Sequence, residues 1–184
     1  KRGNEIFFGY TGRIEKEKGV YVLLEAFIEV VKTFNNFRLF LVGAGNESNY
    51  INSIIKKKGL YGRIILCGFY EGDIYDALSA FDVFVFPSLW EGVPYAILDS
   101  MNAGNIIIST NVGGIPEVIT DGVDGFLIPP CNVEELVNCM KRVGCNLENY
   151  RLMGDNSKEK IKTKYSSKVF RKNVEYVMVS LINL

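Results

Sequence analysis

Six short apolar runs recur along this chain, and most of the segments between them have the spacing of an amphipathic helix. The runs are Ile6–Phe8, Leu39–Val42, Ile64–Cys67, Val83–Phe86, Ile106–Ile108 and Gly125–Ile128. Apolar runs without polar alternation predict strands buried on both faces, and helices between them make the sheet parallel. The sequence therefore predicts an α/β fold, a doubly wound parallel six-stranded sheet with C-terminal helices.

The segments between and after these runs predict the helices. Helical periodicity is clearest at Val20, Leu23, Leu24, Phe27, Val30, Val31 and Phe34. Asn132 with Glu135 predicts an N-cap, and the polar stretch 157–164 is expected to lead into a final helix. That final helix is apolar on more than one face, at Val169, Phe170, Val174, Tyr176, Val177, Met178, Val179 and Leu181. Such a helix should be covered on more than one face, either by folding back over the domain or by packing on something outside this chain.

Composition limits the classes of function. A length of 184 residues fits one domain able to bury a core, and 48% hydrophobic with 23% charged residues is typical of globular proteins. Lysine plus arginine equals aspartate plus glutamate at 21 each, which argues against a nucleic-acid surface or a basic membrane anchor. No apolar run approaches the length of a membrane span. The chain has neither an initiating Met nor a signal peptide, so we expect it to be cut from something longer.

The cysteine and histidine content excludes several kinds of chemistry. The chain has four cysteines, no C-x-x-C pair and no histidine, so we predict no metal site and no histidine general base. Cys67 lies in an apolar run and is expected to be a small core residue. The cysteine usage fits a reducing cytosol.

The stretch 81–104 predicts a strand, a loop and a helix with chemistry at their junction. Pro94 is expected in the first helical turn, and Gly104 ends the helix. Gly92 lets the backbone approach a ligand closely, beside helix N–H groups that suit an anion or a sugar hydroxyl. Glu91 and Asp99 bring two carboxylates to this helix start; the alternative is a solvated acidic face favoured by the helix dipole.

Two further loops follow strands and offer candidate ligand-binding groups. After the first strand, Gly12 permits a tight turn, and Arg13 and Lys18 can bind phosphate oxygens. The alternative is a charged surface loop, because no Walker or G-x-G-x-x-G pattern is present. After the third strand, the loop Gly68-Phe69-Tyr70 offers aromatic and backbone surface for a base, or is simple turn chemistry.

Together these segments resemble one family. The matching motifs, in family order and spacing, are Gly12-Arg13 with Lys18-Gly19, Val42 to Gly45, Pro87 to Gly92, Gly113 to Glu117 and Asp121 to Gly125. They resemble the C-terminal, nucleotide-sugar-binding half of a group 1 retaining glycosyltransferase of the GT-B type, over nearly the whole chain.

The resemblance implies roles for particular residues. Arg13 and Lys18 match the pair that holds the donor diphosphate. Glu91 matches the first carboxylate of the E-x7-E pattern, which faces the transferred sugar, so Glu91, Arg13 and Lys18 are the expected catalytic residues. Asp99 stands where the family usually has a Glu on the ribose. The remaining donor-binding residues would be Gly12, Gly68, Phe69, Tyr70, Gly92, Val93, Pro94 and Tyr95.

The resemblance also implies partners and a setting. The donor is a nucleotide sugar, and neither cofactor nor metal is needed because two cationic side chains take the metal's role. An N-terminal domain, absent here, would bring a sugar or lipid-linked acceptor. The domain 1–184 would then serve polysaccharide or glycoconjugate synthesis in the cytoplasm, with the inner face of the membrane and peripheral association with it left open. The alternatives are a nucleotide-sugar epimerase of the same fold and a catalytically decayed nucleotide-binding module.

Overall fold

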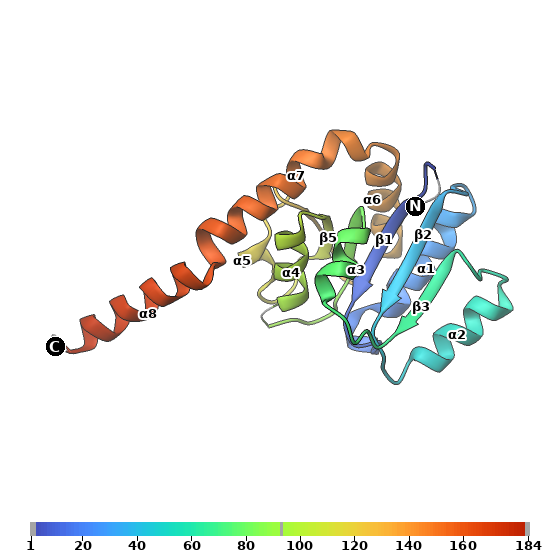
Figure 1. Ribbon diagram of the computed structural model, residues 1–184. Helices are drawn as coiled ribbons and strands as arrows, with labels where there is room; N and C mark the ends of the chain where they lie inside the picture. Colours follow the sequence, from blue (N-terminus) through green and yellow to red (C-terminus); the bar gives the residue numbers. More distant parts are fainter. Residues whose placement is uncertain (1–2, 93, 183–184) are drawn as a thin grey trace.

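The computed structural model describes residues 3–92 and 94–182, and these form a parallel sheet of six strands between layers of helices (Figure 1). The strands are β1 (Ile6–Thr11), β2 (Phe37–Val42), β3 (Ile64–Gly68), β4 (Val83–Phe86), β5 (Ile106–Thr110) and β6 (Phe126–Ile128). Their order is β3-β2-β1-β4-β5-β6, and every neighbouring pair is parallel. The prediction of a doubly wound parallel sheet is confirmed.

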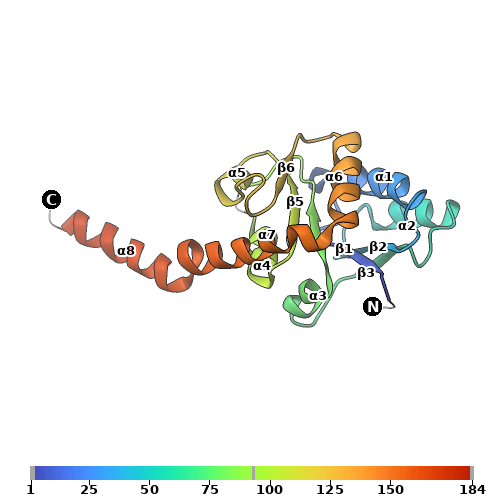
Figure 2. The same ribbon diagram turned by 90° about the horizontal axis from the view of Figure 1, so that it is seen from above.

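Helices cover both faces of the sheet. They are α1 (Val20–Val31), α2 (Ser48–Lys57), α3 (Ile74–Ala80), α4 (Tyr95–Ala103), α5 (Ile115–Val118), α6 (Val133–Cys145), α7 (Leu147–Lys160) and α8 (Ser167–Ile182). Figure 2 shows α1, α2 and α6 on one side of the sheet and α3 and α4 on the other. Helix α1 packs against α6, and α4 packs against both α3 and α7.

The core lies on both faces of the central strands. All four residues of β4 and all five of β5 are buried, which is why these runs lack polar alternation. Aromatic side chains fill the space between β1 and its neighbours: Phe8 packs on Phe27 and Phe37, and Tyr10 stacks on Phe86. Each fully buried side chain of this size contributes roughly 1.5–3 kcal/mol relative to exposure.

The edge strand β3 corrects one expectation. Cys67, predicted to be a core residue, is exposed, and only Ile64 of β3 is fully buried. The reason is its place at the sheet edge, where one side of the strand has no neighbour and α2 covers it only partly. An apolar run thus marked the strand correctly but did not distinguish an edge from the centre.

The helix ends follow the predicted chemistry with one exception. The side chain of Asn132 accepts a hydrogen bond from the backbone N–H of Glu135 at 2.9 Å and caps α6. Gly104 ends α4 with a left-handed φ of 85°. Pro94 was expected in the first turn of α4; it lies one residue earlier, at the N-cap position.

The polar stretch leads into a final helix, as predicted, and the structure excludes one of the two arrangements expected for that helix. The polar stretch 157–164 is helical, because α7 continues to Lys160 and then into a π-helical turn, η2 (Ile161–Tyr165). Helix α8 does not fold back over the domain but extends away from it (Figure 1). Its residues 170–180 are exposed, so the apolar side chains among them lie uncovered by the rest of the described chain.

Candidate functional site

The candidate site lies where the strand order reverses. The chain runs outward from β1 to β3 and then returns to β4 on the other side of β1. At such a switch point the loops after the two central strands diverge and leave a crevice at their carboxyl ends. The loop after β1 carries Arg13 and Lys18, and the loop after β4 carries Glu91 and Gly92.

Tyr10, a buried residue of β1, holds the loop that follows this strand. Its buried hydroxyl donates to the carbonyl oxygen of Arg13 at 2.6 Å. Burial, and then the nearby Glu91, raises the pKa of Tyr10, so the phenol stays a donor. Gly12 adopts a φ of 147°, as a turn at this point requires. Arg13 pairs with Glu17 at 3.2 Å on the surface, with side chains 67% and 47% exposed.

The predicted residues Lys18 and Glu91 meet directly. Lys18 Nζ lies 2.6 Å from Glu91 Oε2, and the two side chains are only 14% and 13% exposed. The ammonium group also lies 5.9 Å above the ring centroid of Phe86. An ion pair this enclosed is screened far less by water than the Arg13–Glu17 pair. Lys18 and Arg13 therefore occupy different electrostatic surroundings.

Ser88 was not predicted, and it joins the two loops. Its fully buried hydroxyl lies 2.8 Å from the carbonyl oxygen of Trp90, 3.2 Å from that of Glu17 and 3.3 Å from Glu91 Oε2. The hydroxyl of Thr110, at the end of β5, donates to the Ser88 carbonyl at 2.6 Å. A small polar residue next to Pro87, which follows the buried strand β4, was the available sequence signal.

Glycines let these loops lie against one another. An added β-carbon on Gly19 would lie 1.8 Å from the carbonyl oxygen of Pro87. The loop after β5 approaches in the same way, because a β-carbon on Gly114 would lie 2.2 Å from the Gly92 carbonyl oxygen. The N–H of Gly114 also donates to the Glu91 carbonyl at 3.3 Å. The backbone of Glu91 and Gly92 is thus held by main chain from a third strand end.

A pocket of about 310 Å³ opens beside the loop after β1. It brings together the predicted residues Gly12, Arg13, Phe69 and Tyr70, and its other lining residues are Thr11, Val42, Gly43, Ala44 and Ile74. Gly68, also predicted, accepts a hydrogen bond from the N–H of Gly43 at 2.8 Å at the edge of this region. The aromatic side chains, apolar floor and exposed backbone suit a flat heterocycle.

Asp99 lies between α3 and α4, and its hydrogen bond is with Tyr75 of α3 rather than with the Lys18–Glu91 pair. Its carboxylate accepts from the Tyr75 hydroxyl at 3.4 Å, and Asn102 donates to that same hydroxyl at 2.9 Å. Burial raises the pKa of Asp99, and the hydrogen bond from Tyr75 opposes this shift. Tyr75 follows Ile74, a lining residue of the 310 Å³ pocket, so α3 links the two places.

The start of α4 presents the other predicted residues. Gly92 is exposed, and an added β-carbon there would meet no described atom within 4 Å apart from its chain neighbours. The space above this residue is therefore open to a ligand. Pro94 is buried, and Tyr95 is 73% exposed. Val93 lies outside the described residues.

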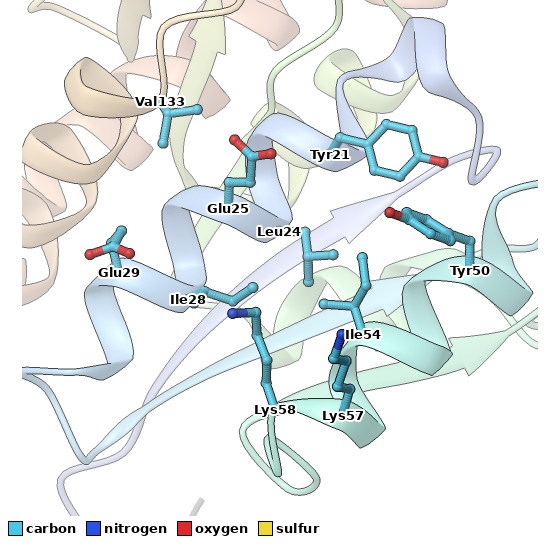
Figure 3. Close-up of a pocket in the computed structure, with 10 residues that line it drawn as sticks. All are labelled: Tyr21, Leu24, Glu25, Ile28, Glu29, Tyr50, Ile54, Lys57, Lys58 and Val133. Carbon is cyan, nitrogen blue, oxygen red and sulfur yellow. The ribbon is translucent and has the colours of Figure 1, made fainter.

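A second cavity lies away from the strand ends. This groove of about 750 Å³ runs between α1 and α2 (Figure 3). Figure 3 shows Leu24, Ile28 and Ile54 between the glutamates of α1 and the lysines of α2. It contains none of the predicted site residues.

Residues 3–92 and 94–182 contain neither a cluster of metal ligands nor a helix able to span a membrane. No cluster of three or more His, Cys, Asp and Glu side chains there could hold a metal ion. In the same residues, no helix combines the length and hydropathy that crossing a bilayer requires.

Comparison with known proteins decides the family. A family model described as "Glycosyl transferases group 1" matches residues 1–160. This chain belongs to the group 1 glycosyltransferases. It is 33% identical over 149 residues to the Escherichia coli UDP-Gal:alpha-D-GlcNAc-diphosphoundecaprenol alpha-1,3-galactosyltransferase, a match that covers 76% of the chain and 37% of the relative. It is 28% identical over 158 residues to alpha-D-kanosaminyltransferase of Streptomyces kanamyceticus, which covers 85% of the chain and 41% of the relative.

A solved structure supports the same membership for this glycosyltransferase chain. The C-terminal domain of the group 1 family protein LpcC from Francisella tularensis superposes with a TM-score of 0.81 at 25% identity. The match covers 88% of this chain and 87% of that domain. By contrast, the chain spans only about two fifths of the curated relatives that it matches.

Proposed function

We propose that this chain is the donor-binding, C-terminal half of a group 1 glycosyltransferase that binds a nucleotide diphospho-sugar. The observation that carries the proposal is the enclosed Lys18–Glu91 pair at the switch point, with Nζ and Oε2 2.6 Å apart. It places a cation suited to a diphosphate next to a carboxylate suited to sugar hydroxyls. The similarity to an isolated C-terminal domain supports the domain assignment 1–184.

The donor would extend across the strand ends. Its base would lie in the 310 Å³ pocket on Phe69 and Tyr70, near Gly12 and Gly68. Asp99 would bind the ribose, and Arg13 and Lys18 the diphosphate. The sugar would face Glu91 and the start of α4, at Gly92, Val93, Pro94 and Tyr95. Uridine diphosphate is the first nucleotide to test, because the E. coli relative's name gives UDP-galactose as its donor.

The chemistry follows from charge development on the leaving group. When the bond between the sugar and the phosphate breaks, negative charge grows on the phosphate oxygen. Lys18 and Arg13 would stabilise that charge, which is the role a metal ion has in other transferases, so we propose metal-independent transfer. We further propose retention of configuration, with Glu91 binding the transferred sugar most strongly in the transition state.

Transfer would need more than this chain. We propose that an N-terminal domain supplies the acceptor, a sugar or a lipid-linked sugar, for polysaccharide or glycoconjugate synthesis in the cytoplasm or at the inner face of the membrane. The 184-residue chain alone should then bind donor and transfer nothing. Robust transfer by the purified chain would contradict this division of labour.

The test is a thermal-shift panel of nucleoside diphosphates and nucleotide sugars, each with and without a chelator. A ligand that binds only the folded chain raises its midpoint by mass action, by an amount that grows with concentration. We expect a shift with at least one nucleoside diphosphate, unchanged by chelator. A panel with no shift at millimolar concentration refutes donor binding, and a shift lost in chelator refutes metal independence.

Two alternatives share the same diphosphate site. The half-buried Asp99, hydrogen-bonded to Tyr75, is the observation that would favour a decayed nucleotide-binding module, since its carboxylate already has a partner. A nucleotide-sugar epimerase is the other alternative. Product analysis with the whole protein separates transfer from epimerisation, and a module without catalysis gives neither product.

A further inference from the structure

The carboxylate of Glu91 has two hydrogen-bond donors, and they differ in what holds them. Within residues 3–92 and 94–182, Oε2 accepts from Lys18 at 2.6 Å and lies 3.3 Å from the Ser88 hydroxyl. The ammonium group of Lys18 lies at the end of a long, flexible side chain. Ser88 is fully buried, and the Thr110 hydroxyl fixes its carbonyl at 2.6 Å. One partner can therefore move while the other stays.

Lys18 is the charged partner of Glu91, and in the proposed function it also binds the diphosphate, so the two groups share one ammonium. If its ammonium turns toward a diphosphate, a carboxylate only 13% exposed loses its charged partner. A buried charge that loses a partner is costly unless another donor replaces it. The affinity for the donor therefore depends on which hydrogen-bond donor replaces Lys18 at the Glu91 carboxylate.

Among the described residues, the Ser88 hydroxyl is the donor near Glu91 Oε2 besides Lys18, and it is positioned to respond. A hydroxyl carries a single proton, and three acceptors lie around this one: the carbonyls of Trp90 at 2.8 Å and Glu17 at 3.2 Å, and Glu91 Oε2 at 3.3 Å. The shortest contact is to Trp90, so with Lys18 in place the proton is best used there. Rotation of the hydroxyl alone would redirect it to Glu91.

We propose that Ser88 is a positioning residue that takes over the Glu91 carboxylate when Lys18 turns to the donor diphosphate. This inference rests on the proposed function for the role of Lys18. Ser88 itself touches no substrate. It holds the Glu91 carboxylate aimed at the sugar position, and it lowers the free energy needed to release Lys18.

The first experiment is a double-mutant cycle on uridine diphosphate affinity, measured by calorimetry on the whole chain. With Glu91 present, Ser88→Ala should weaken binding about tenfold, the value of one hydrogen bond to a charged group. In a Glu91→Gln background, the same change should have less than about a twofold effect, because no carboxylate is left unpaired. An equal loss in both backgrounds, or no loss in either, overturns the proposal.

Ser109→Ala is the matched control. Ser109 is also a fully buried serine near a strand end, and its hydroxyl donates to the Phe86 carbonyl at 2.7 Å without contacting Glu91. It should leave the affinity for uridine diphosphate unchanged in both backgrounds. Ser88→Cys, close to serine in size and a weak donor, replaces Ser88→Ala if the alanine variant does not fold.

A second cycle needs no ligand and separates this inference from the proposed function. Thermal unfolding is compared for the wild-type chain, Lys18→Met, Ser88→Ala and the double variant. The unfolding midpoint of the double variant should fall by more than the sum of the falls in the two single variants, because Glu91 then has neither donor. Adding Glu91→Gln should remove that excess. If no nucleotide binds, the proposed function fails. Independently of that result, additive losses of the unfolding midpoint in this cycle overturn the role of Ser88.

Discussion

The carbonyl oxygen of Glu91 lies 1.8 Å from where a β-carbon on Gly113 would stand. Gly113 also has a φ of 52°, so a side chain there meets both backbone strain and main chain. The close contact with the loop after β5 therefore fixes the position of the Glu91 backbone at the strand ends. No local sequence pattern expresses this relationship, because it joins two loops that follow neighbouring strands.

Gly113→Ala should destabilise the chain by about 3 kcal/mol or more, measured by denaturant unfolding. The control is Gly122→Ala, since Gly122 has a φ of 74°, but a β-carbon added there would meet no described atom within 4 Å apart from its chain neighbours. Gly122→Ala should carry only the left-handed strain, about 1–2 kcal/mol. Equal effects would mean that the contact with Glu91 yields easily.

Removal of either cation should weaken nucleoside diphosphate binding. We expect Arg13→Ala and Lys18→Ala to lower the binding free energy by about 1.5–3 kcal/mol each, as measured by calorimetry. Lys16→Ala should have little effect, because Lys16 is exposed on the same turn and is not expected to contact the diphosphate. Small and equal effects at all three positions would indicate a solvated charge cluster.

Glu91 and Asp99 should have separable roles. Glu91→Gln should keep nucleoside diphosphate binding or tighten it slightly, since Lys18 no longer leaves an ion pair, while turnover of the whole enzyme falls strongly. Asp99→Asn should weaken nucleoside diphosphate itself. Asp99→Glu tests whether the shorter side chain fits loosely, in which case binding is kept or improved. Loss of binding in Glu91→Gln with none in Asp99→Asn would reverse the assignment.

The raised pKa of Asp99 predicts a pH dependence of stability. Because burial raises its pKa above the ordinary value of 3.8, the native chain binds this proton more tightly than the unfolded chain. The stability contribution of Asp99 should fall as the pH rises from about 3.8 through the raised value, and stay constant above it. Asp99→Asn should therefore raise the unfolding midpoint at pH 7 relative to the wild-type chain, and less so near pH 3.5. Tyr75→Phe should move the transition to higher pH, because it removes the bond that lowers this pKa.

Helix α8 should be protected in the whole protein but not in this chain. Residues 170–180 are exposed here, and Phe170, Tyr176 and Met178 are among its large apolar side chains. Contiguous exposed apolar surface of this kind marks an interaction site. Hydrogen exchange of α8 amides should be fast in the 184-residue chain and slow in the whole protein, where we expect the acceptor domain to lie near it. Fast exchange in both would contradict that packing.

Much of the fold could be predicted because its central strands are buried on both faces. The predicted bounds Val83–Phe86 match β4. The misses concern surroundings rather than local preference. Cys67 is exposed because β3 is an edge strand. The polar stretch 157–164 leads into the final helix as predicted, and tertiary contacts hold it. One such contact is the enclosed Lys160–Asp124 pair, 2.7 Å apart.

The site could be predicted as a set of loops but not as a set of contacts. The candidate residues other than Asp99 lie in loops that follow apolar runs or at the start of the next helix, which places them near strand ends. The pairing of Lys18 with Glu91, 73 residues apart, depends on β1 lying beside β4, and local patterns do not encode that order. Ser88 and Tyr75 escaped notice because each acts through a neighbour's carboxylate.

The place of Trp90 makes this chain its own fluorescent reporter. It is the single tryptophan in the sequence, 71% exposed, one residue before Glu91, and its carbonyl accepts from Ser88. Its emission comes from the loop that the Lys18–Glu91 pair restrains, with no other indole to dilute the signal. Occupancy of the crevice can thus be followed by intrinsic emission, without a label and without an enzymatic assay.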